Sequence, residues 1–398
     1  MRRVMFFCQN FLGLGHLART AAILEQLDGR AETCLVFGGQ RPPSWPIPRS
    51  TRTVELPALR RHEGKLLVVD DDRSLKTVKA VRARLIAEVF DRFAPDVLVI
   101  EGFPFSKRAL AFELVPLLTR AHARRPRPQV LCSLRDIVMA KPYSPKKRAR
   151  KETGTIAWAN RFFDGVLVHA DPRVFRLDER FERMHALRSP MHYTGYVVQP
   201  APRPDDPDPD LDPGRPTILV SVGGGRLGHD LLDGITRAAP LLGDRIDHRI
   251  LTYTGPFAPD DLYAELCRRA DGQPQLHIRR FTTDFIGHMK AADLSISLFG
   301  YNTAMNVLST GVRALTLPSD KDLEQPLRAR SFAQKGLVGL LEPADLKPRR
   351  LAERIISALA TTHRAPAIDF DLDGAARAAD VILHAGRMPA AAPRRSRI

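Results

Sequence analysis

Residues that could carry acid–base chemistry stand where short apolar runs end. His16 follows the apolar run at residues 4–8 and a loop that contains Gly13 and Gly15. Because glycines permit a tight turn from strand to helix, the sequence predicts a helix over residues 16–27 with the imidazole at its amino end. The helix dipole and the loss of solvent both lower the pKa of such a histidine, which leaves a neutral ring able to accept a proton. The alternative is a histidine that only caps the helix.

Two carboxylates occupy similar places after later apolar runs. Glu101 ends the run at residues 96–101, and Asp136 follows the run at residues 129–134. A carboxylate in this position can instead cap a helix or pair with a cation, and Asp136 has Arg135 beside it. We take His16, Glu101 and Asp136 as the candidate catalytic residues.

Two glycine turns could bind phosphate. Gly300 follows the run at residues 293–298 and opens a predicted helix that closes at Gly311. A helix start presents unpaired N–H groups and the positive end of its dipole to an anion, although ordinary helix capping would use the same residues. After the run at residues 217–222, three successive glycines expose further N–H groups, and a following arginine could neutralise a diphosphate. The candidate residues are Gly223, Gly224, Gly225, Arg226, Gly300, Asn302, Thr303 and Ala304.

A polar cluster that could bind hydroxyl groups follows the next strand. Glu324 and Gln325 stand, with Asp322, at the start of another predicted helix. In an open parallel sheet, ligands lie beyond the carboxyl ends of the strands, so this cluster could face the same crevice as the Gly300 turn. Phosphate-binding groups beside hydroxyl-binding groups suggest a nucleotide sugar as ligand.

The elements that position these residues alternate between strand and helix. Apolar runs separated by helical segments predict a doubly wound parallel sheet in each half of the chain. The fold class is therefore α/β, with two Rossmann-like domains facing a central cleft. The predicted strands are residues 1–8, 32–37, 52–56, 96–101, 129–134, 165–169, 191–197, 217–222, 247–253, 275–279, 293–298, 313–317 and 337–341.

Composition shifts predict the domain boundaries. Residues 199–216 are dominated by Pro and Asp, which disfavour helix and central strand, so we expect a linker between a first domain at residues 1–198 and a second at residues 217–370. A helix within residues 371–388 could pack back on the first domain, and residues 389–398 are expected to be disordered.

The chain is basic, with 61 Lys and Arg against 45 Asp and Glu and a net charge of +16. Such a balance favours anionic partners, and coding bias toward arginine is the alternative explanation. Only two Trp and six Tyr are available for stacking on bases, which argues against nucleic acid. Six basic residues within residues 141–151 leave peripheral contact with an anionic membrane open.

The same features indicate a cytoplasmic location, with attachment to the inner face of the membrane left open. No apolar run approaches the roughly 18 residues of a membrane span, and the first apolar run is too short for a signal peptide. The four cysteines are widely separated, so free thiols are expected and no metal site is predicted.

The order of these motifs resembles that of the nucleotide-sugar glycosyltransferases of the two-domain type called GT-B. The shared pattern comprises G-x-G-H after the first strand, a Pro-rich linker, a G-G-G turn, G-x-N-T before a helix, and E-Q after the next strand. Within this type the chain resembles glycosyltransferase family 28, which includes the muramoyl-peptide N-acetylglucosaminyltransferases, and a bacterial group of predicted glycosyltransferases. The resemblance covers most of the chain.

The resemblance implies roles for individual residues. His16 would act as the base or orient the acceptor, with Gly13 and Gly15 shaping its loop. A glutamate that grips the ribose is usual where this chain has Asn306, a departure that puts donor binding in doubt. The remaining donor-side residues would be Gly223, Gly224, Gly225 and Arg226 for the diphosphate, Phe281 and Thr282 for the base, Asn302, Thr303 and Ala304 for phosphate, and Glu324 and Gln325 for the sugar.

The reaction implied is an inverting displacement without a metal or other cofactor, with a nucleotide-diphosphate sugar, most simply a UDP-sugar, as co-substrate. A lipid-linked acceptor would fit the basic segment and its neighbours Phe103 and Tyr143, and a soluble natural product is the other choice. Three rival functions stay open. They are a nucleotide-sugar 2-epimerase, a nucleotide- or anion-binding protein that has lost catalysis, and a nucleic-acid-binding protein.

Overall fold

The computed structural model describes residues 1–11, 13–42, 45–62, 64–69, 71–139, 141–199, 214–320, 323–361 and 369–386. Most of the linker expected at residues 199–216 lies outside the described residues, as do Asp322 and the tail expected at residues 389–398. Those expectations remain predictions.

The first domain is built on a seven-stranded parallel sheet with the order β3-β2-β1-β6-β7-β8-β9. Its central strands are apolar over most of their length because helices cover both faces of the sheet. The strands are β1 (Arg2–Cys8), β2 (Ala31–Phe37), β3 (Arg52–Glu55), β6 (Val97–Glu101), β7 (Gln129–Arg135), β8 (Gly165–His169) and β9 (Met191–Tyr193).

Alternate residues of β1 pack into different layers. Val4 and Phe6 share one cluster with α1 (Gly15–Leu27) and α11 (Gly374–His384), whereas Met5 and Phe7 share another with helices on the opposite face. The helices of that opposite face are α2 (Leu75–Phe93), α3 (Ala111–Ala123) and α4 (Pro145–Phe162). This period of two is what a strand covered on both faces requires.

One element was not expected from the sequence. An antiparallel hairpin joins β4 (Leu59–His62) to β5 (Lys65–Val68), and Gly64 has a φ of 84° in its turn. Its side chains, apart from that of Leu59, are partly buried or exposed. The segment therefore lacks the apolar pattern that marks the other strands.

The second domain has a six-stranded parallel sheet with the order β12-β11-β10-β13-β14-β15. Its strands are β10 (Thr217–Ser221), β11 (Arg249–Tyr253), β12 (Leu276–Arg279), β13 (Leu294–Ser297), β14 (Ala314–Thr316) and β15 (Gly339–Leu340). Its helices are α5 (His229–Gly243), α6 (Asp260–Ala270), α7 (Phe285–Ala291), α8 (Tyr301–Thr310), α9 (Glu324–Gln334) and α10 (Pro348–Ala360). Two parallel sheets with helices on both faces confirm the predicted fold class.

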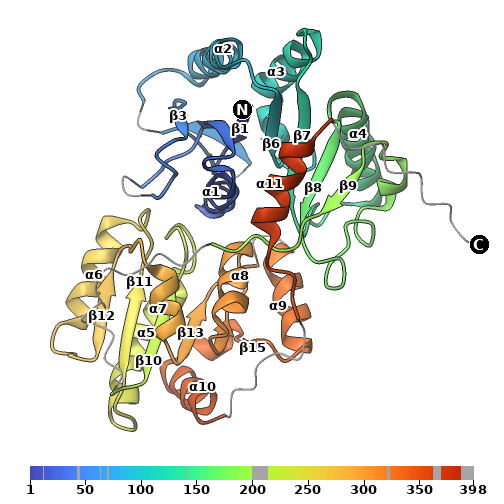
Figure 1. Ribbon diagram of the computed structural model, residues 1–398. Helices are drawn as coiled ribbons and strands as arrows, with labels where there is room; N and C mark the ends of the chain where they lie inside the picture. The colour runs from blue at the N-terminus through green and yellow to red at the C-terminus, as the bar shows by residue number, and fades with distance from the viewer. Residues whose placement is uncertain are drawn as a thin grey trace, which may run out of the picture.

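The short 3₁₀ helices complete the described elements. They are η1 (Arg108–Leu110), η2 (Glu182–Ala186) and η3 (Pro343–Leu346). Figure 1 shows the two sheets in separate halves of the molecule, with α8 and α9 on the side of the second half that faces the first.

The last described helix lies on the first domain. Figure 1 shows α11, in red, crossing from the second half to lie beside β8. Ala378 and Ile382 of α11 are fully buried in the cluster that contains α1 and β1, and the Arg2 guanidinium donates to the carbonyls of Ile382 (3.2 Å) and Ala385 (2.8 Å). Helix α11 therefore stabilises the packing of β1 and α1 in the first domain.

Buried polar contacts join the two domains directly. The Tyr301 hydroxyl at the start of α8 donates to the carbonyl of His169 (2.8 Å) and accepts from the amide of Val197 (3.1 Å). Arg328 of α9 forms a bidentate ion pair with Asp136, with distances of 2.6 and 2.8 Å. These contacts bring the carboxyl edge of the first sheet against the helices that follow β13 and β14.

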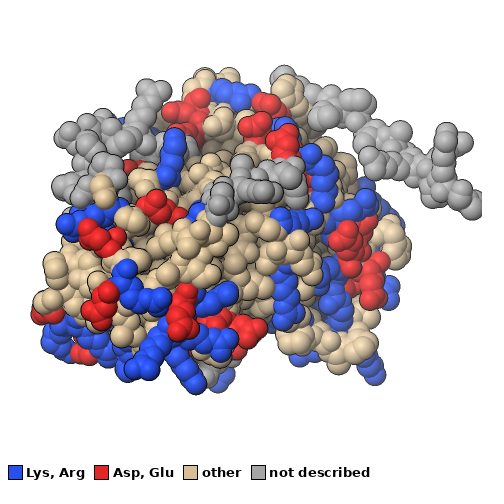
Figure 2. Space-filling model, turned by 90° about the horizontal axis from the view of Figure 1, so that it is seen from below, with Lys and Arg blue, Asp and Glu red and all other residues tan. Residues whose placement is uncertain are grey.

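The surface is rich in cationic side chains. In Figure 2, Lys and Arg side chains spread over the face seen from below, with Asp and Glu among them rather than apart from them. No helix of the described residues is both long enough and apolar enough to cross a bilayer.

Candidate functional site

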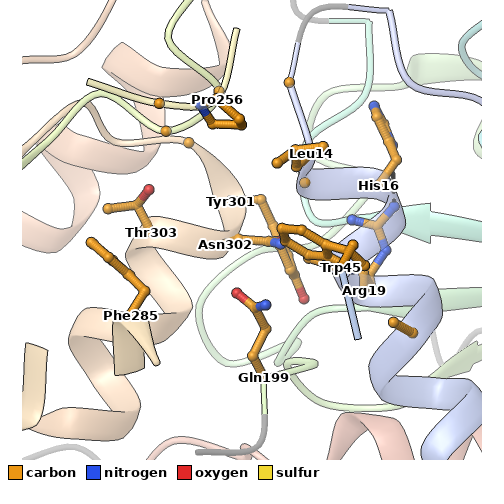
Figure 3. Close-up of a pocket in the computed structure, with 18 of the residues that line it drawn as sticks. Leu14, His16, Arg19, Trp45, Gln199, Pro256, Phe285, Tyr301, Asn302 and Thr303 are labelled. Atoms are coloured by element: carbon orange, nitrogen blue, oxygen red, sulfur yellow. Dashed lines mark hydrogen bonds between the residues drawn. The ribbon is translucent and has the colours of Figure 1, made fainter. Parts of the chain in front are cut away.

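A cavity of about 1340 Å³ lies between the two domains. Pockets for small ligands commonly occupy about 300 to 1,000 Å³, so this one has room for two molecules of moderate size. The first domain contributes the G-x-G-H loop, part of α1 and residues 45–49, and the second contributes the turns after β10, β12 and β13 and the start of α9. Figure 3 shows side chains of both domains converging on it.

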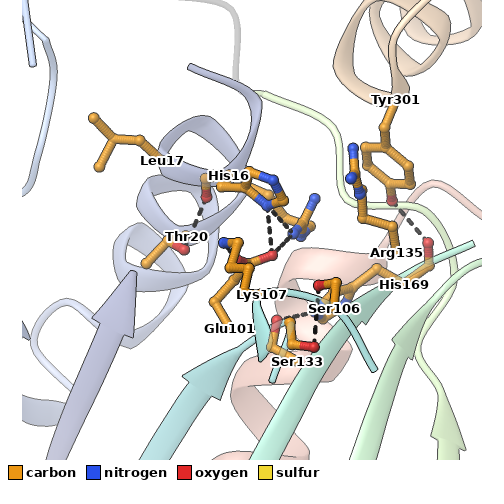
Figure 4. Close-up of polar contacts among 12 residues, drawn as sticks. His16, Leu17, Thr20, Glu101, Ser106, Lys107, Ser133, Arg135, His169 and Tyr301 are labelled. Atoms are coloured by element: carbon orange, nitrogen blue, oxygen red, sulfur yellow. Dashed lines mark hydrogen bonds and ion pairs between the residues drawn. The ribbon is translucent and has the colours of Figure 1, made fainter. Parts of the chain in front are cut away.

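His16 and Glu101 come together at the carboxyl edge of the first sheet. The Glu101 Oε1 lies 2.7 Å from His16 Nδ1, as Figure 4 shows, and this carboxylate also contacts Lys107. Its third partner is Arg19. A carboxylate at this distance favours the tautomer in which Nδ1–H donates to it, which leaves Nε2 as the acceptor. Because His16 lines the cavity, Nε2 is available to a ligand.

The surroundings of His16 favour its neutral form. Burial lowers its pKa well below the ordinary value, and the positive charges of Lys107, Arg135 and Arg19 lower the pKa further. Burial also lowers the pKa of Lys107 well below its usual range. Glu101 orients the imidazole while its own charge is shared with two cations, so His16 remains a base at neutral pH.

Asp136 is not placed for catalysis. It is 2% exposed and does not line the cavity, and both of its carboxylate oxygens are bound by Arg328. It does not pair with Arg135, which instead lies 2.8 Å from Glu324 across the cleft. The structure gives no support to the catalytic assignment of Asp136, because Arg328 of the second domain binds its carboxylate.

The glycine turn after β10 faces the cavity in part. Gly223, Gly224 and Arg226 line the cavity, but Gly225 does not. Gly225 has a φ of 86°, and a Cβ there would lie 2.5 Å from the carbonyl oxygen of Thr254 and 2.6 Å from the amide of Ala258. It permits close packing of two backbone segments rather than contact with a ligand.

Arg226 connects the two domains at this turn. Its guanidinium lies 4.7 Å from the ring centroid of Phe257 and donates to the side-chain oxygen of Gln40 in the first domain. An arginine held in this way beside the cavity would lose little further side-chain entropy on binding an anion.

The amino end of α8, like the glycine turn, forms part of the cavity wall that the second domain contributes. Gly300 is its N-cap, and Gly300, Asn302 and Thr303 line the cavity, whereas Ala304 is fully buried away from it. The side chain of Asn306, one turn further along, also lines the cavity. The Oδ1 atoms of Asn302 and Asn306 are buried and accept no hydrogen bond from the described residues, so both can accept from ligand hydroxyls.

Glu324 and Gln325 line the cavity at the start of α9. Glu324 is paired with Arg135 at 2.8 Å and with Arg328 at 3.0 Å. The Gln325 Oε1 accepts from the amides of Phe299 and Ser319, at 3.1 Å each, which fixes its side-chain amide. Both side chains are thus held by protein contacts beside the cavity.

Phe281 and Thr282, proposed to read a base, also line the cavity. Trp45 from the first domain approaches Phe281, with ring centroids 6.1 Å apart. Trp45 itself was not singled out from the sequence, because it lies in a loop without periodicity.

The two aromatic residues proposed for the acceptor side do not reach the cavity. Phe103 is fully buried and stacks on Trp158 at 5.2 Å, and Tyr143 lies beneath the ammonium groups of Lys147 and Lys151. Neither lines the cavity. The first-domain residues that do line this part of the cavity include Gly13, Leu14, Gly15, Arg19, Trp45 and Ile47.

Arg19 and Lys107 were missed from the sequence. Arg19 lies three residues after His16 and therefore on the same face of α1, a spacing that could have identified it. Lys107 has no such local signal, because its contact with Glu101 depends on a left-handed turn with a φ of 54°. Among the described residues, no group of three His, Cys, Asp or Glu side chains could hold a metal ion.

Comparison with known proteins supports the fold and the second domain. Residues 217–377 match the model of the glycosyltransferase family 28 C-terminal domain. The sequence matches no curated relative.

Solved structures resemble the whole chain. The glycosyltransferase of kitacinnamycin is 15% identical over 96% of this chain and 98% of that chain, with a TM-score of 0.59. MurG of Acinetobacter baumannii is 15% identical over 96% and 97% of the chains, with a TM-score of 0.52. A protein from Listeria monocytogenes assigned as a UDP-N-acetylglucosamine 2-epimerase is 13% identical over 96% and 94%, with a TM-score of 0.61.

At these identities the structural similarity establishes the fold, which glycosyltransferases and an epimerase share. The family match adds that the second domain is similar in sequence to one family's C-terminal domain. Residues 217–377 thus match the glycosyltransferase family 28 C-terminal domain, and the chain as a whole has the GT-B fold.

Proposed function

We propose that this protein transfers a sugar from a nucleotide-diphosphate sugar to an acceptor hydroxyl, with inversion and without a metal. The proposal rests on one observation: a candidate base on the first domain and candidate phosphate-binding turns on the second line the same cavity. His16, held from behind by Glu101, lines the wall of the first domain, and the start of α8 with the Gly223 turn lines the wall of the second.

The donor would lie against the second domain. The amides of the Gly223–Gly224 turn and the first turn of α8 both suit a diphosphate, and Arg226 adds a positive charge nearby. The unpartnered Oδ1 atoms of Asn302 and Asn306 suit hydroxyl groups of the sugar or ribose. Asn306 can accept where a glutamate is usual, but as a neutral amide it would bind a ribose less tightly.

The reaction requires one proton transfer and one displacement. Nε2 of His16 takes the proton of the acceptor hydroxyl, whose oxygen forms a bond to the anomeric carbon. The bond from that carbon to the diphosphate oxygen breaks, and its electron pair leaves with the nucleoside diphosphate. Charge then develops on the leaving group, where helix amides and Arg226 stabilise the transition state more than the ground state.

Calorimetry with UDP, GDP and TDP and their common sugar conjugates tests the donor half of the proposal. We expect one nucleotide to bind with a micromolar Kd and Arg226→Ala to weaken that binding about tenfold or more. Arg237→Ala, which removes an exposed arginine of α5 outside the cavity, is the matched control and should bind like the wild type. Failure of every nucleotide to bind would contradict the proposal.

The epimerase function has support from the fold shared with the Listeria protein. Incubation with a UDP-sugar in the absence of an acceptor separates the two functions. An epimerase produces the epimer of the nucleotide sugar with no acceptor present, whereas a transferase leaves the sugar configuration of unreacted donor unchanged.

A further inference from the structure

The buried guanidinium of Arg19 is only partly satisfied by the protein. Its side chain is 1% exposed and lines the cavity, and its Nη2 donates to Glu101. Nε and Nη1 are buried, and no described residue accepts a hydrogen bond from either. Since Nε carries one hydrogen and Nη1 two, most of the five N–H donors of this arginine have no acceptor.

Leaving such donors unsatisfied is costly. A buried charged group that lacks hydrogen-bond partners is destabilising, so such a group calls for an explanation. Burial lowers the pKa of Arg19 to about 10, which keeps it charged at neutral pH. The nearest carboxylate, Glu101, also contacts Lys107 and His16 and so cannot serve Arg19 alone.

The position of Arg19 assigns it to the acceptor side of the cavity. It lies on α1, in the first domain, and its Nη2 is 3.4 Å from Nδ1 of His16. Figure 3 shows His16 and Arg19 projecting from the same helix, with Trp45 nearby. Trp45 also lines the cavity, and its buried Nε1 has no acceptor among the described residues. Arg19 and Trp45 of the first domain therefore offer hydrogen-bond donors to a ligand, whereas Asn302 and Asn306 of α8 offer hydrogen-bond acceptor atoms.

We propose that the acceptor is an anion whose carboxylate or phosphate binds Arg19 while its hydroxyl contacts His16. This inference rests on the proposed function and names its acceptor class. Residues three apart on a helix have Cβ atoms about 5 to 6 Å apart, so the anionic group must lie only a few bonds from the attacking hydroxyl. Hydroxy acids and hydroxyl-bearing phosphates have this arrangement.

The rim of the first domain fits an anionic acceptor. Arg61 and Lys141 line the cavity, and Arg61 lies close enough to Lys151 to lower its pKa, after the larger effects of burial, Arg108, Lys147 and Arg150. None of Arg61, Lys141, Lys147, Arg150 and Lys151 forms an ion pair with a described carboxylate. Of these five residues, Arg61 and Lys141 line the cavity, together with the acidic Glu25 and Asp28. Positive charge that no ion pair offsets raises the local concentration of anions.

Paired probes that differ only in charge test the inference in the wild-type protein. We would measure the binding of 2-hydroxybenzoate against 2-hydroxybenzamide for the carboxylate, and of glycerol 3-phosphate against glycerol for the phosphate, by calorimetry. Charge-assisted hydrogen bonds predict at least about tenfold tighter binding of one anion than of its neutral partner. The pair that shows the difference identifies the anionic group.

Variants then locate the binding group. Arg19→Gln should remove the preference for the anion, Arg19→Lys should retain part of it, and Arg30→Gln should leave it unchanged, because Arg30 is exposed and lies outside the cavity. Equal binding of charged and neutral probes by the wild type would overturn the inference without any variant. An unchanged preference in a folded Arg19→Gln protein would overturn it as well.

A last arm distinguishes the acceptor from the donor. The anion titration is repeated with the protein saturated by the nucleotide found in the donor panel, and we expect the anion still to bind. If the nucleotide displaces the anion and Arg19→Gln loses nucleotide binding, then Arg19 serves the donor phosphate and the acceptor inference fails. If no nucleotide binds to the wild-type protein in the donor panel, the proposed function itself is contradicted.

Discussion

At the scale of residues, the unusual feature is a histidine–carboxylate pair inside a cationic cluster. A carboxylate beside a histidine ordinarily raises the histidine pKa. Here Glu101 also contacts Arg19 and Lys107, and the net result of burial and these cations is a pKa well below the ordinary value. The carboxylate sets the ring orientation while the cations keep the ring neutral. His16 can therefore act as a base without first losing a proton at neutral pH.

We expect an NMR titration to place the pKa of His16 below 6.5, the ordinary value for a histidine. Because the unfolded chain then binds this proton more readily than the folded protein, the free energy of unfolding falls as the pH drops below about 6.5. Lys107→Gln removes a neighbouring positive charge and should move the His16 pKa upward. His16→Gln identifies the resonance, and a wild-type pKa above 6.5 would contradict this account.

The variant His16→Ala tests the base itself. Loss of a general base commonly reduces kcat by about 10²- to 10⁴-fold, whereas nucleotide binding across the cavity should be unchanged. Once an acceptor is known, turnover and nucleotide affinity measured on the same sample provide the check. If kcat of His16→Ala falls by less than about tenfold, another group must take the proton.

At the scale of elements, the site depends on loops that the sheets hold in close packing. The turn after β10 crosses the turn after β11, where Gly225 and Gly255 have φ values of 86° and 87° and little space beside their Cα atoms. This crossing fixes the turn whose Gly223 and Gly224 line the cavity. The start of α8 is fixed in a similar way by Tyr301, whose hydroxyl is bound to the first domain.

Gly225→Ala should disturb both folding and donor binding. The left-handed backbone alone costs about 1 to 2 kcal/mol for a residue with a side chain, and the Cβ would also clash with Thr254 and Ala258. Gly272→Ala is the matched control, since Gly272 has a φ of 79° but no atom within 4 Å of the added Cβ. Urea unfolding should show the larger loss for Gly225→Ala, and equal losses would show that crowding is unimportant there.

At the scale of the whole molecule, the two domains share one packed interior. A single apolar cluster extends from β1 and α2 across the interface to Phe299 and Phe332, and α11 returns to cover the first sheet. The buried Asp136–Arg328 pair lies within this interface, where the two carboxylates near Arg328 raise its pKa although burial opposes the charge. These contacts hold Glu324 and Arg135 together across the cavity.

Removing one partner of the buried pair should be strongly destabilising. Asp136→Ala leaves the Arg328 charge in the interior without its bidentate partner, a loss expected to cost about 3 to 5 kcal/mol. The exposed pair Arg120–Asp91 is the comparison, and Arg120→Ala should cost less than about 1 kcal/mol. Urea unfolding measures both changes. The double variant Asp136→Leu with Arg328→Met should recover much of the loss, and failure to recover would mean that the pair contributes more than charge compensation.

Sequence by itself determined the features that depend on local pattern. Apolar runs of strand length alternating with amphipathic segments identify two parallel sheets, because a strand covered on both faces needs no polar alternation. Glycines at Gly300 and Gly311 delimit α8, and the G-x-G-H loop places His16 at a helix start. The residues of the donor half came from these local signals and, for Phe281, Thr282 and Asn306, from the family resemblance, and all but Gly225 and Ala304 of them line the cavity.

Tertiary structure alone decided which of the polar residues meet. Glu101 reaches His16 from 85 residues away and Asp136 reaches Arg328 from 192 residues away, and neither separation has a period that a sequence could reveal. The same holds for Trp45 and Lys107, whose places in the site come from loops. Pairing of distant charged groups depends on how the two domains pack, and the local sequence carries no record of that packing.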